Sequence, residues 1–401
     1  MLEYEDVLEA RERVVQTARE TPLERSYTFS EMTGADVYLK LETFQRTGSF
    51  KVRGATNRIA TLSDAEKEAG VVAASAGNHA QGVALAATRT GVDSKIVMPE
   101  HAPVSKVDAT RSYGAEVVLH GIDYDEAAMR AHEIEAEEGR TFVHAFDDPL
   151  VMAGQGTIGL EIVEQCPDVE TVVVPIGGGG LIAGIATVMK AQDHDVRVVG
   201  VEAEGASRLA GHKNQARELD AVDTIADGIA TRKIGEETRK VIAERVDEVV
   251  SVSDSEIAVA LTRLLERSKT LVEGAGAVPL AAVLAEAFDY DDDEVIVPAL
   301  CGGNIDLNVL TTVILRGLAE TGRYLRFRTT LKDRPGALED LVAILSAHRA
   351  NIYAIQHDRT SRDVAMNDAE VEIDLETRGE DHVEALLDAL ERHDYEVEVL
   401  V

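Results

Sequence analysis

Short β-rich runs alternate with amphipathic helical stretches between residues 37 and 201, and this alternation leaves few folds open to the chain. The β-rich runs cover residues 37–41, 71–74, 95–98, 116–119, 171–175 and 196–201. Helical patterns between them include 80–89, 124–137 and 152–164. Strands that alternate with helices favour an α/β fold with mainly parallel sheets and helices on both faces. An apolar run at 295–300 and a helical pattern at 307–320 close this unit.

The pattern changes after Gly322. The expected order is a strand at 324–331, a helix at 336–348, strands at 352–360 and 369–376, a helix at 382–393 and a strand at 395–401. This βαββαβ order is that of a ferredoxin-like unit. We therefore predict two domains, residues 1–322 and 323–401, with a smaller subdomain at about 52–145 inside the first.

Composition excludes several classes of protein. No apolar run approaches the roughly 20 residues needed to span a bilayer, and the charged N-terminus is typical of an amphipathic helix and not of a signal peptide. Cys166 and Cys301 can form neither a disulfide framework nor a metal-ligand spacing. We therefore expect a soluble, cytoplasmic protein with no membrane partner.

The formal net charge is −33, and the acidic residues are spread along the whole chain. Nucleic acid is a poor partner for such a charge because its phosphates would be repelled. An acidic, solvated surface is the expected consequence. Only 11 of the 40 basic residues are lysine and aromatic residues make up 4%, which suggests a halophilic protein whose self-repulsion is screened by salt.

Lys51 follows Thr47-Gly48-Ser49-Phe50 at a predicted helix entrance. A lysine there is placed to form a Schiff base if its pKa is lowered. Most single lysines, however, are surface residues, so this segment alone decides nothing.

A second segment, Ser75-Ala76-Gly77-Asn78-His79, lies between the β-rich run 71–74 and a predicted helix. Free N–H groups at a helix start suit a carboxylate, and Asn78 can donate to a phenolate-like oxygen. His79 could be a general base, although a packed, hydrogen-bonded histidine is the favoured interpretation.

A third segment, Gly177-Gly178-Gly179-Gly180-Leu181, follows the run 171–175 and could bring backbone amides close to a phosphate. A nicotinamide dinucleotide site is an alternative, because Gly178, Gly180 and Ala183 fit G-x-G-x-x-A and Glu202 lies 24 residues beyond Gly178. Against it, about 170 residues of α/β pattern precede this fingerprint, which usually opens its domain. The fourth segment is Cys301-Gly302-Gly303-Asn304, after the run 295–300.

In this order and spacing, TGSFKVRGA, SAGNHAQG, GGGGL and CGGN resemble the threonine dehydratases and serine racemases of the fold-type II (tryptophan synthase β-like) pyridoxal-phosphate enzymes. The resemblance covers about residues 1–320. It implies pyridoxal 5′-phosphate as the cofactor, Lys51 as its Schiff-base lysine and as the base at Cα, Phe50 against its ring and Asn78 at its 3′ oxygen. It also implies that the backbone amides of Gly177, Gly178, Gly179, Gly180 and Leu181 hold the phosphate.

The same resemblance assigns the loop Ser75, Ala76, Gly77, Asn78 and His79 to the substrate carboxylate, and Cys301 to the pyridine nitrogen. Two positions depart from relatives. Cys301 stands where serine is usual, and a thiol is a weaker hydrogen-bonding group than a hydroxyl. Ala76 stands where eukaryotic-type serine racemases carry a serine that acts as a second base, so we expect proton transfer on one face of the substrate.

Metal binding is the third point of comparison. Some relatives bind a cation near the segment that matches residues 200–206, but Arg208 stands where serine racemases place an acidic ligand. We expect no tight divalent metal site, while a monovalent ion stays open.

The resemblance implies β-elimination of L-threonine to 2-oxobutanoate and ammonia, and of L-serine to pyruvate. A racemase or β-replacing enzyme of the same fold, and a non-catalytic amino-acid sensor, are the alternatives. Residues 323–401, with Asp333-Arg334-Pro335-Gly336-Ala337-Leu338 after the first strand, resemble an ACT domain, which implies an amino-acid effector such as isoleucine or valine. A dimerisation module without a ligand is the other reading, and the family suggests a homo-oligomer, a dimer or a tetramer.

Overall fold

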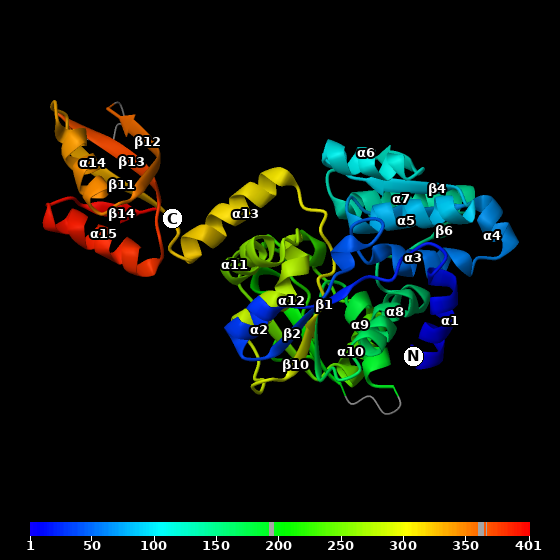
Figure 1. Ribbon diagram of the computed structural model, residues 1–401. Helices are drawn as coiled ribbons and strands as arrows, with labels where there is room; N and C mark the ends of the chain where they lie inside the picture. Colours follow the sequence, from blue (N-terminus) through cyan, green and yellow to red (C-terminus); the bar gives the residue numbers. More distant parts are fainter. Residues whose placement is uncertain (192–195, 360–364, 366) are drawn as a thin grey trace. The chain divides into compact units, whose positions relative to one another are not determined.

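The computed structural model describes residues 1–401 except 192–195, 360–364 and 366. The chain forms two compact units, Met1–Asp306 and Leu307–Val401. Figure 1 shows that the first unit contains two sheets, each packed against helices, and that the second contains a single sheet with helices.

The larger sheet of the first unit has the strand order β1-β2-β10-β7-β8-β9. These strands are β1 (Leu23–Arg25), β2 (Asp36–Lys40), β10 (Val295–Pro298), β7 (Thr171–Pro175), β8 (Arg197–Ala203) and β9 (Glu248–Val252). Only β1 pairs antiparallel with its neighbour, and the other pairings are parallel. Every residue of β7 is buried, as expected for a β-branched run with both faces covered by helices.

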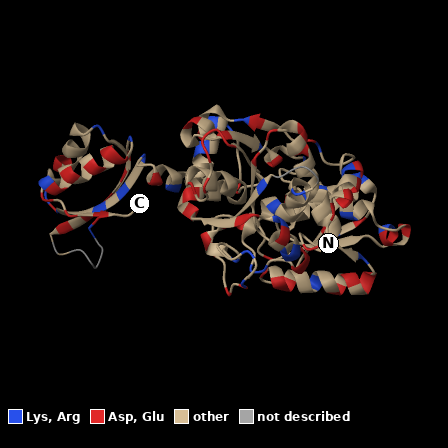
Figure 2. Ribbon diagram, turned by 90° about the horizontal axis from the view of Figure 1, so that it is seen from below, with Lys and Arg blue, Asp and Glu red and all other residues tan. Residues whose placement is uncertain are grey.

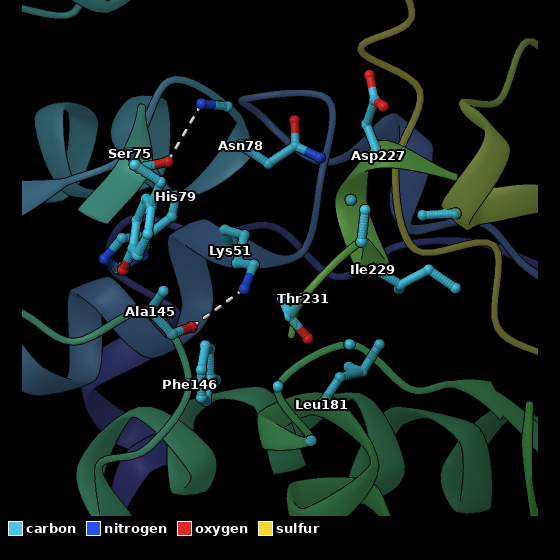
Figure 3. Close-up of a pocket in the computed structure, with 18 of the residues that line it drawn as sticks. Lys51, Ser75, Asn78, His79, Ala145, Phe146, Leu181, Asp227, Ile229 and Thr231 are labelled. Atoms are coloured by element: carbon cyan, nitrogen blue, oxygen red, sulfur yellow. Dashed lines mark hydrogen bonds between the residues drawn. The ribbon is translucent and has the colours of Figure 1, made fainter. Parts of the chain in front are cut away.

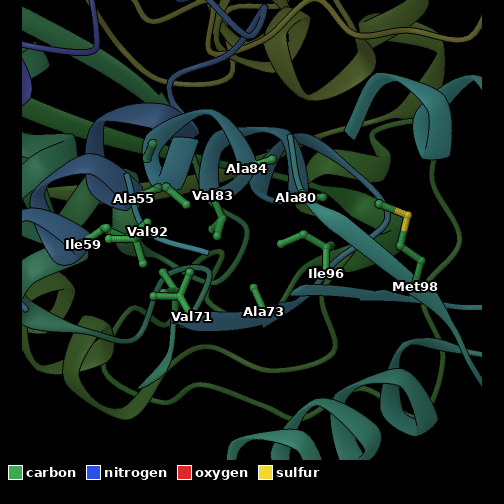
Figure 4. Close-up of a cluster of buried hydrophobic side chains, with 14 of the residues drawn as sticks. Ala55, Ile59, Val71, Ala73, Ala80, Val83, Ala84, Val92, Ile96 and Met98 are labelled. Atoms are coloured by element: carbon green, nitrogen blue, oxygen red, sulfur yellow. The ribbon is translucent and has the colours of Figure 1, made fainter. Parts of the chain in front are cut away.

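The smaller sheet is wholly parallel, with the order β5-β4-β3-β6. Its strands are β3 (Val71–Ala74), β4 (Ser94–Met98), β5 (Glu116–Leu119) and β6 (Thr141–Phe142). Alternate residues of β3 point to opposite faces. Val71 and Ala73 pack in a core with α3 (Lys51–Ala60), α5 (Asn78–Thr90) and α6 (Val104–Ser112), shown in Figure 4.

On the other face of this sheet, Val72 and Ala74 pack against α7 (Tyr124–Glu138). The predicted parallel sheets with helices on both faces are therefore confirmed. The remaining helices of the first unit are α1 (Tyr4–Val14), α2 (Tyr27–Thr33), α4 (Asp64–Ala69), α8 (Pro149–Gln165), α9 (Gly180–Met189), α10 (Glu236–Arg245), α11 (Asp254–Arg263) and α12 (Gly274–Leu284).

A buried ion network ties α3 to its surroundings. Arg53 is 1% exposed and donates to both carboxylate oxygens of Glu42, at 2.7 and 2.9 Å, and of Glu161, at 2.6 and 3.0 Å. Lys40 Nζ donates to Glu161 Oε2 at 2.6 Å. Two cations thus face two carboxylates, so the network carries no net charge. The network links β2, α3 and α8, and its member Arg53 lies two residues after Lys51 in the chain.

The second unit contains α13 (Leu307–Glu320), β11 (Tyr324–Lys332), α14 (Ala337–Ala347), β12 (Asn351–Asp358), β13 (Asp368–Glu376), α15 (Glu380–Arg392) and β14 (Val397–Val399). The antiparallel sheet has the order β12-β13-β11-β14. The predicted βαββαβ order is confirmed, although Thr360, the expected end of the third element, lies outside the described residues.

Helix α13 groups with the second unit, whereas the sequence pattern joined residues 307–320 to the first domain. Its contacts with β11 account for this grouping. The functional boundary near residue 322 therefore stays a prediction.

Acidic residues occur along helices and loops of both units and are interspersed with Lys and Arg (Figure 2). Within the part of the chain that the structure describes, none of the helices has the length and apolar character needed to cross a bilayer.

Candidate active site

A cavity of about 710 Å³ opens in the first unit. Its lining includes residues from the loops that follow β3, β6, β7 and β10, so it lies at the carboxyl ends of parallel strands from both sheets. Ligand sites in α/β folds are commonly found there. Lining residues from the four motifs are Phe50, Lys51, Ser75, Gly77, Asn78, His79, Gly177, Gly178, Gly179, Leu181 and Cys301.

Lys51 is the first residue of α3 and faces the cavity (Figure 3). Its Nζ donates to the carbonyl of Ala145 at 3.0 Å. Burial lowers the pKa of its ammonium group to about 8, and the nearby Cys301 and Glu273 raise it only in part. No carboxylate among the described residues forms an ion pair with it. Lys51 is therefore not a solvated surface lysine, and a large fraction of its amine is neutral near pH 8.

The loop from Ser75 to His79 leads into α5. Ser75 Oγ accepts the N–H of Gly77 at 3.1 Å. Asn78 is oriented at both ends, because its Oδ1 accepts from Asn304 at 2.8 Å and its Nδ2 donates to Glu273 at 2.7 Å. One proton of Nδ2 is thus left for a ligand in the cavity.

His79 is 4% exposed, and its Nε2 lies 2.9 Å from the carbonyl oxygen of Val143, to which it donates. Burial, with the nearby Lys51, lowers the pKa of its imidazole to about 3. The ring is therefore neutral, in the packed and hydrogen-bonded arrangement that the sequence favoured.

Two predicted site residues do not line the cavity. The methyl group of Ala76 packs against the core of the smaller sheet. Gly180 is the first residue of α9, and a Cβ there would meet the backbone of Phe146.

The glycines of the third motif meet close neighbours. A Cβ at Gly178 would overlap the ring of Phe146, and Gly179 has φ +94°, a left-handed conformation that side chains rarely adopt. The N–H groups from Gly177 to Leu181 find no acceptor on the described residues. Free amides at the start of a ten-residue helix, with no room for side chains, fit the phosphate of pyridoxal phosphate.

The dinucleotide alternative does not fit this loop. Glu202, which would have to reach a ribose, is fully buried and accepts the N–H groups of Arg208, Leu209 and Ala210. Its other oxygen accepts from the Arg208 side chain at 3.2 Å. The same ion pair occupies the segment considered for a metal. In the ranges that the structure describes, no group of three or more His, Cys, Asp or Glu could hold a metal ion.

Cys301 lines the cavity and its Sγ donates to the carbonyl of Ala275 at 3.5 Å. Burial raises the pKa of its thiol, so the group is protonated. A ring nitrogen near it would meet a thiol that already has an acceptor.

Sequence reasoning missed several lining residues. Glu273 is buried, and burial raises the pKa of its carboxyl group. His144 accepts the N–H groups of Phe146 and Asp147 on Nδ1, at 3.2 and 2.8 Å, which places its proton on Nε2. Thr231 lies between β8 and α10, where the described helices are short 3-10 turns. No local pattern marks these residues, although Glu273 before Gly274-Ala275-Gly276 could have been noticed as a helix start.

Comparison with known proteins agrees with this geometry. Residues 14–302 match the family of pyridoxal-phosphate dependent enzymes, and residues 324–398 match the ACT domain. The chain is 46% identical to an L-threonine ammonia-lyase of Thermotoga maritima over 402 residues, which covers 100% of both chains.

Two further relatives cover only part of the chain. A catabolic L-threonine dehydratase of Escherichia coli is 46% identical over 312 residues, which are 77% of this chain and 95% of the relative. A solved threonine deaminase of Solanum lycopersicum superposes with a TM-score of 0.73 at 39% identity, and covers 78% of this chain and 93% of that one.

The environment of Lys51 predicts its titration. In cofactor-free protein, labelling of Nζ by acetic anhydride should rise through pH about 8, because burial favours the neutral amine, whereas an ordinary lysine titrates near 10.4. Mass spectrometry of the peptide that carries Lys51 measures the rate, with the surface lysines as the reference for reagent activity. An apparent pKa near 10 would show that the amine is solvated.

Proposed function

Because this chain belongs to the pyridoxal-phosphate dependent enzymes, among the L-threonine ammonia-lyases, we propose that it converts L-threonine to 2-oxobutanoate and ammonia. L-Serine would give pyruvate by the same β-elimination. The observation that carries the proposal is the Lys51 amine, whose pKa is lowered, in one cavity with a glycine loop of free amides. A sensor without catalysis would not need such an amine.

The cofactor is pyridoxal 5′-phosphate, and the described residues fit it. We assign its phosphate to the amides of Gly177, Gly178, Gly179, Gly180 and Leu181, which have no acceptor of their own in the described structure. Phe50 would pack against its ring, Asn78 would donate to its 3′ oxygen and Cys301 would face its ring nitrogen. When bound, the cofactor supplies an electron-withdrawing ring that spreads the negative charge formed at Cα.

Lys51 would bind the cofactor covalently and then act as the base that removes the Cα proton. Its pKa of about 8 leaves part of the amine neutral at neutral pH, as a general base requires. The carbonyl of Ala145, 3.0 Å away, holds one N–H and thereby helps to orient the Nζ lone pair. The neutral His79 has its Nε2 proton committed to Val143. Ala76 offers no hydroxyl, so we assign proton transfer to one face.

The substrate carboxylate would bind at the loop from Ser75 to His79. This loop includes the first residues of α5, a helix of 13 residues whose first N–H groups carry partial positive charge. Ser75, Gly77 and Asn78 line the cavity, while Ala76 could contribute only its backbone.

We assign regulation to the ACT domain, and place the functional boundary near residue 322, because β11 begins at Tyr324. The segment from Asp333 to Leu338 surrounds the start of α14, where Gly336 has φ +92°. Isoleucine or valine is our proposed effector, which would place the enzyme in isoleucine biosynthesis. Exposed apolar residues in this unit, Tyr353 on edge strand β12 and Leu307 on α13, support a homo-oligomer.

We also propose a cytoplasmic, salt-adapted protein with an acidic surface. A net charge of −33 on 401 residues repels itself at low ionic strength. Salt shortens the range of this repulsion to about 3 Å at 1 M.

Removal of the Lys51 amine tests the chemistry. Lys51→Ala should lose both covalent cofactor and turnover, the latter by at least about 10²–10⁴-fold, because both depend on the same nitrogen. Release of 2-oxobutanoate from L-threonine and the protein mass after borohydride reduction are the two measurements. Lys95→Ala, which removes a lysine that is paired with Glu138 and does not line the cavity, is the control. Near-normal 2-oxobutanoate release by Lys51→Ala would remove Lys51 from the mechanism.

Truncation tests the regulatory domain. Chains that end at Asp306 and at Gly322 should retain lyase activity, since the E. coli relative matches only 77% of this chain, but should lose any response of their L-threonine saturation curve to isoleucine or valine. Coupling of about 1–3 kcal/mol would give a shift of roughly 5–150-fold in the full chain. The mass of each form in solution shows whether the ACT domain is also required for oligomerisation. An unchanged response in the truncated chains would place the effector site in the first unit.

Salt dependence tests the surface. The melting temperature should rise between 0.05 and about 2 M KCl as the acidic surface is screened, with sorbitol at matched osmolality as the control. A melting temperature that does not change with KCl concentration would contradict salt adaptation.

A further inference from the structure

Arg208 is a buried charge that the mechanism does not use. It is 2% exposed and lies five residues after the end of β8. Its Nε donates to Glu202 Oε1 at 3.2 Å, and neither side chain is accessible to solvent. Replacement of a buried ion pair by apolar side chains is often neutral or stabilising. Stability alone therefore explains this arginine poorly.

The remaining N–H groups of Arg208 reach two segments that border the cavity. Nη2 donates to the carbonyl of Ile176 at 3.0 Å. Nη1 donates to the carbonyl of Thr231 at 2.8 Å and also to its Oγ1. The guanidinium group thus bridges the end of β7 and the wall that contains Thr231, from the side away from the cavity.

The contact with Ile176 fixes the direction of the next amide. The C=O of Ile176 and the N–H of Gly177 belong to one planar peptide group, and it is trans, like every described peptide bond. In a trans peptide these two bonds point in opposite directions. An arginine that holds the oxygen therefore directs the Gly177 N–H away from itself, and Gly177 lines the cavity.

The contact with Thr231 has a similar effect on a hydroxyl group. Thr231 Oγ1 accepts a hydrogen bond from Arg208, so its own proton remains free to donate. Thr231 lines the same cavity as Lys51 and Leu181 (Figure 3). A positive charge behind each group also polarises it, which strengthens the hydrogen bond that it donates forward.

A second amide of the glycine loop, the N–H of Gly179, is oriented by an uncharged side chain. The carbonyl of Gly178 accepts from Thr238 Oγ1 at 2.7 Å, which fixes the Gly179 N–H in the same way. Glu202 meanwhile binds three backbone N–H groups of residues 208–210 with its other oxygen, and so anchors that turn independently of the guanidinium group.

We propose that Arg208 is a positioning residue that directs and strengthens the Gly177 N–H and the Thr231 O–H as donors to the phosphate of bound pyridoxal phosphate. The proposal rests on the assignment of this cofactor, and not on the identity of the amino-acid substrate. It assigns to Arg208 an effect on affinity for the phosphate group in particular.

The test compares two ligands on cofactor-free protein. Arg208→Ala should bind pyridoxal 5′-phosphate at least about tenfold more weakly than the parent, since two donors lose the charge that orients and polarises them, while affinity for pyridoxal, which lacks the phosphate, should change little. Isothermal titration measures both affinities. Arg197→Met, on the same strand β8 and paired with Glu248 at the surface, is the matched control and should leave both unchanged.

Rescue separates positioning from folding. Millimolar guanidinium chloride should restore phosphate-ligand affinity to Arg208→Ala, whose side chain leaves space, but not to Arg208→Met, which fills it; sodium chloride at equal ionic strength is the salt control. An equal loss for both ligands, or no loss at all, would overturn the proposal. Should Arg208→Ala not fold, Thr231→Val keeps the ion pair and removes one donor, and it must show the same phosphate-selective loss. Because the readout is cofactor affinity, it stands even if L-threonine proves not to be the substrate.

Discussion

The buried network of Arg53, Glu42, Glu161 and Lys40 is the interaction on which the rest of the structure depends. Its four charges are balanced and almost wholly removed from water, so each is satisfied only if β2, α3 and α8 meet in one arrangement. Breaking a single partner of such a network is expensive because the others are left charged in a poorly solvated site. Arg53 lies two residues beyond Lys51, so the same contacts fix the first turn of α3. The ion network thereby fixes the position of Lys51, whose own amine forms no ion pair with a carboxylate among the described residues.

The segment from Val143 to Asp148 then assembles the cavity. Val143 accepts from His79, Ala145 accepts from Lys51, and Asp147 accepts the first N–H groups of α10. Phe146 lies against Gly178, and Asp148 caps α8 and pairs with Arg58. Nearly every residue of this segment thus contacts a different element. Other elements also fix the shape of the glycine loop. Phe146 leaves no room for side chains at Gly178, and Arg208 and Thr238 donate hydrogen bonds to the carbonyls of Ile176 and Gly178. An anion site made of backbone amides needs such support, since the amides themselves have no side chain with which to hold their direction.

Much of the fold could be predicted, and the reasons are local. The apolar, valine-containing runs at 71–74 and 171–175 are strands with these bounds because such residues pack well on both faces of a parallel sheet. The βαββαβ order of the second unit could be predicted from its turn residues and from the alternation of strand and helix patterns. The short strands β1 and β6, of three and two residues, gave no usable periodicity. Helix α13 was placed in the first domain because its pattern follows the last long strand, but its packing partner, β11, comes later in the chain. Ala76 and Gly180 were predicted to belong to the site by their place in a motif; neither lines the cavity, so only their backbone groups are left for the predicted role.

The sequence by itself determined the family and the cofactor, and it predicted Lys51 as the residue that binds the cofactor, because short motifs at helix starts indicate where amides, a lysine and a thiol lie. Only the tertiary structure decided which distant residues complete the site. Asn78 and Glu273 are 195 residues apart in the chain but 2.7 Å apart in space. Arg208 and Thr231 are joined across a long loop, and Phe146, in the loop that follows β6 of the smaller sheet, lies against Gly178. Such contacts depend on how two sheets and their loops pack, and no local periodicity records that packing. The lowered pKa of Lys51 is decided in the same way, since burial exists only once the chain has folded.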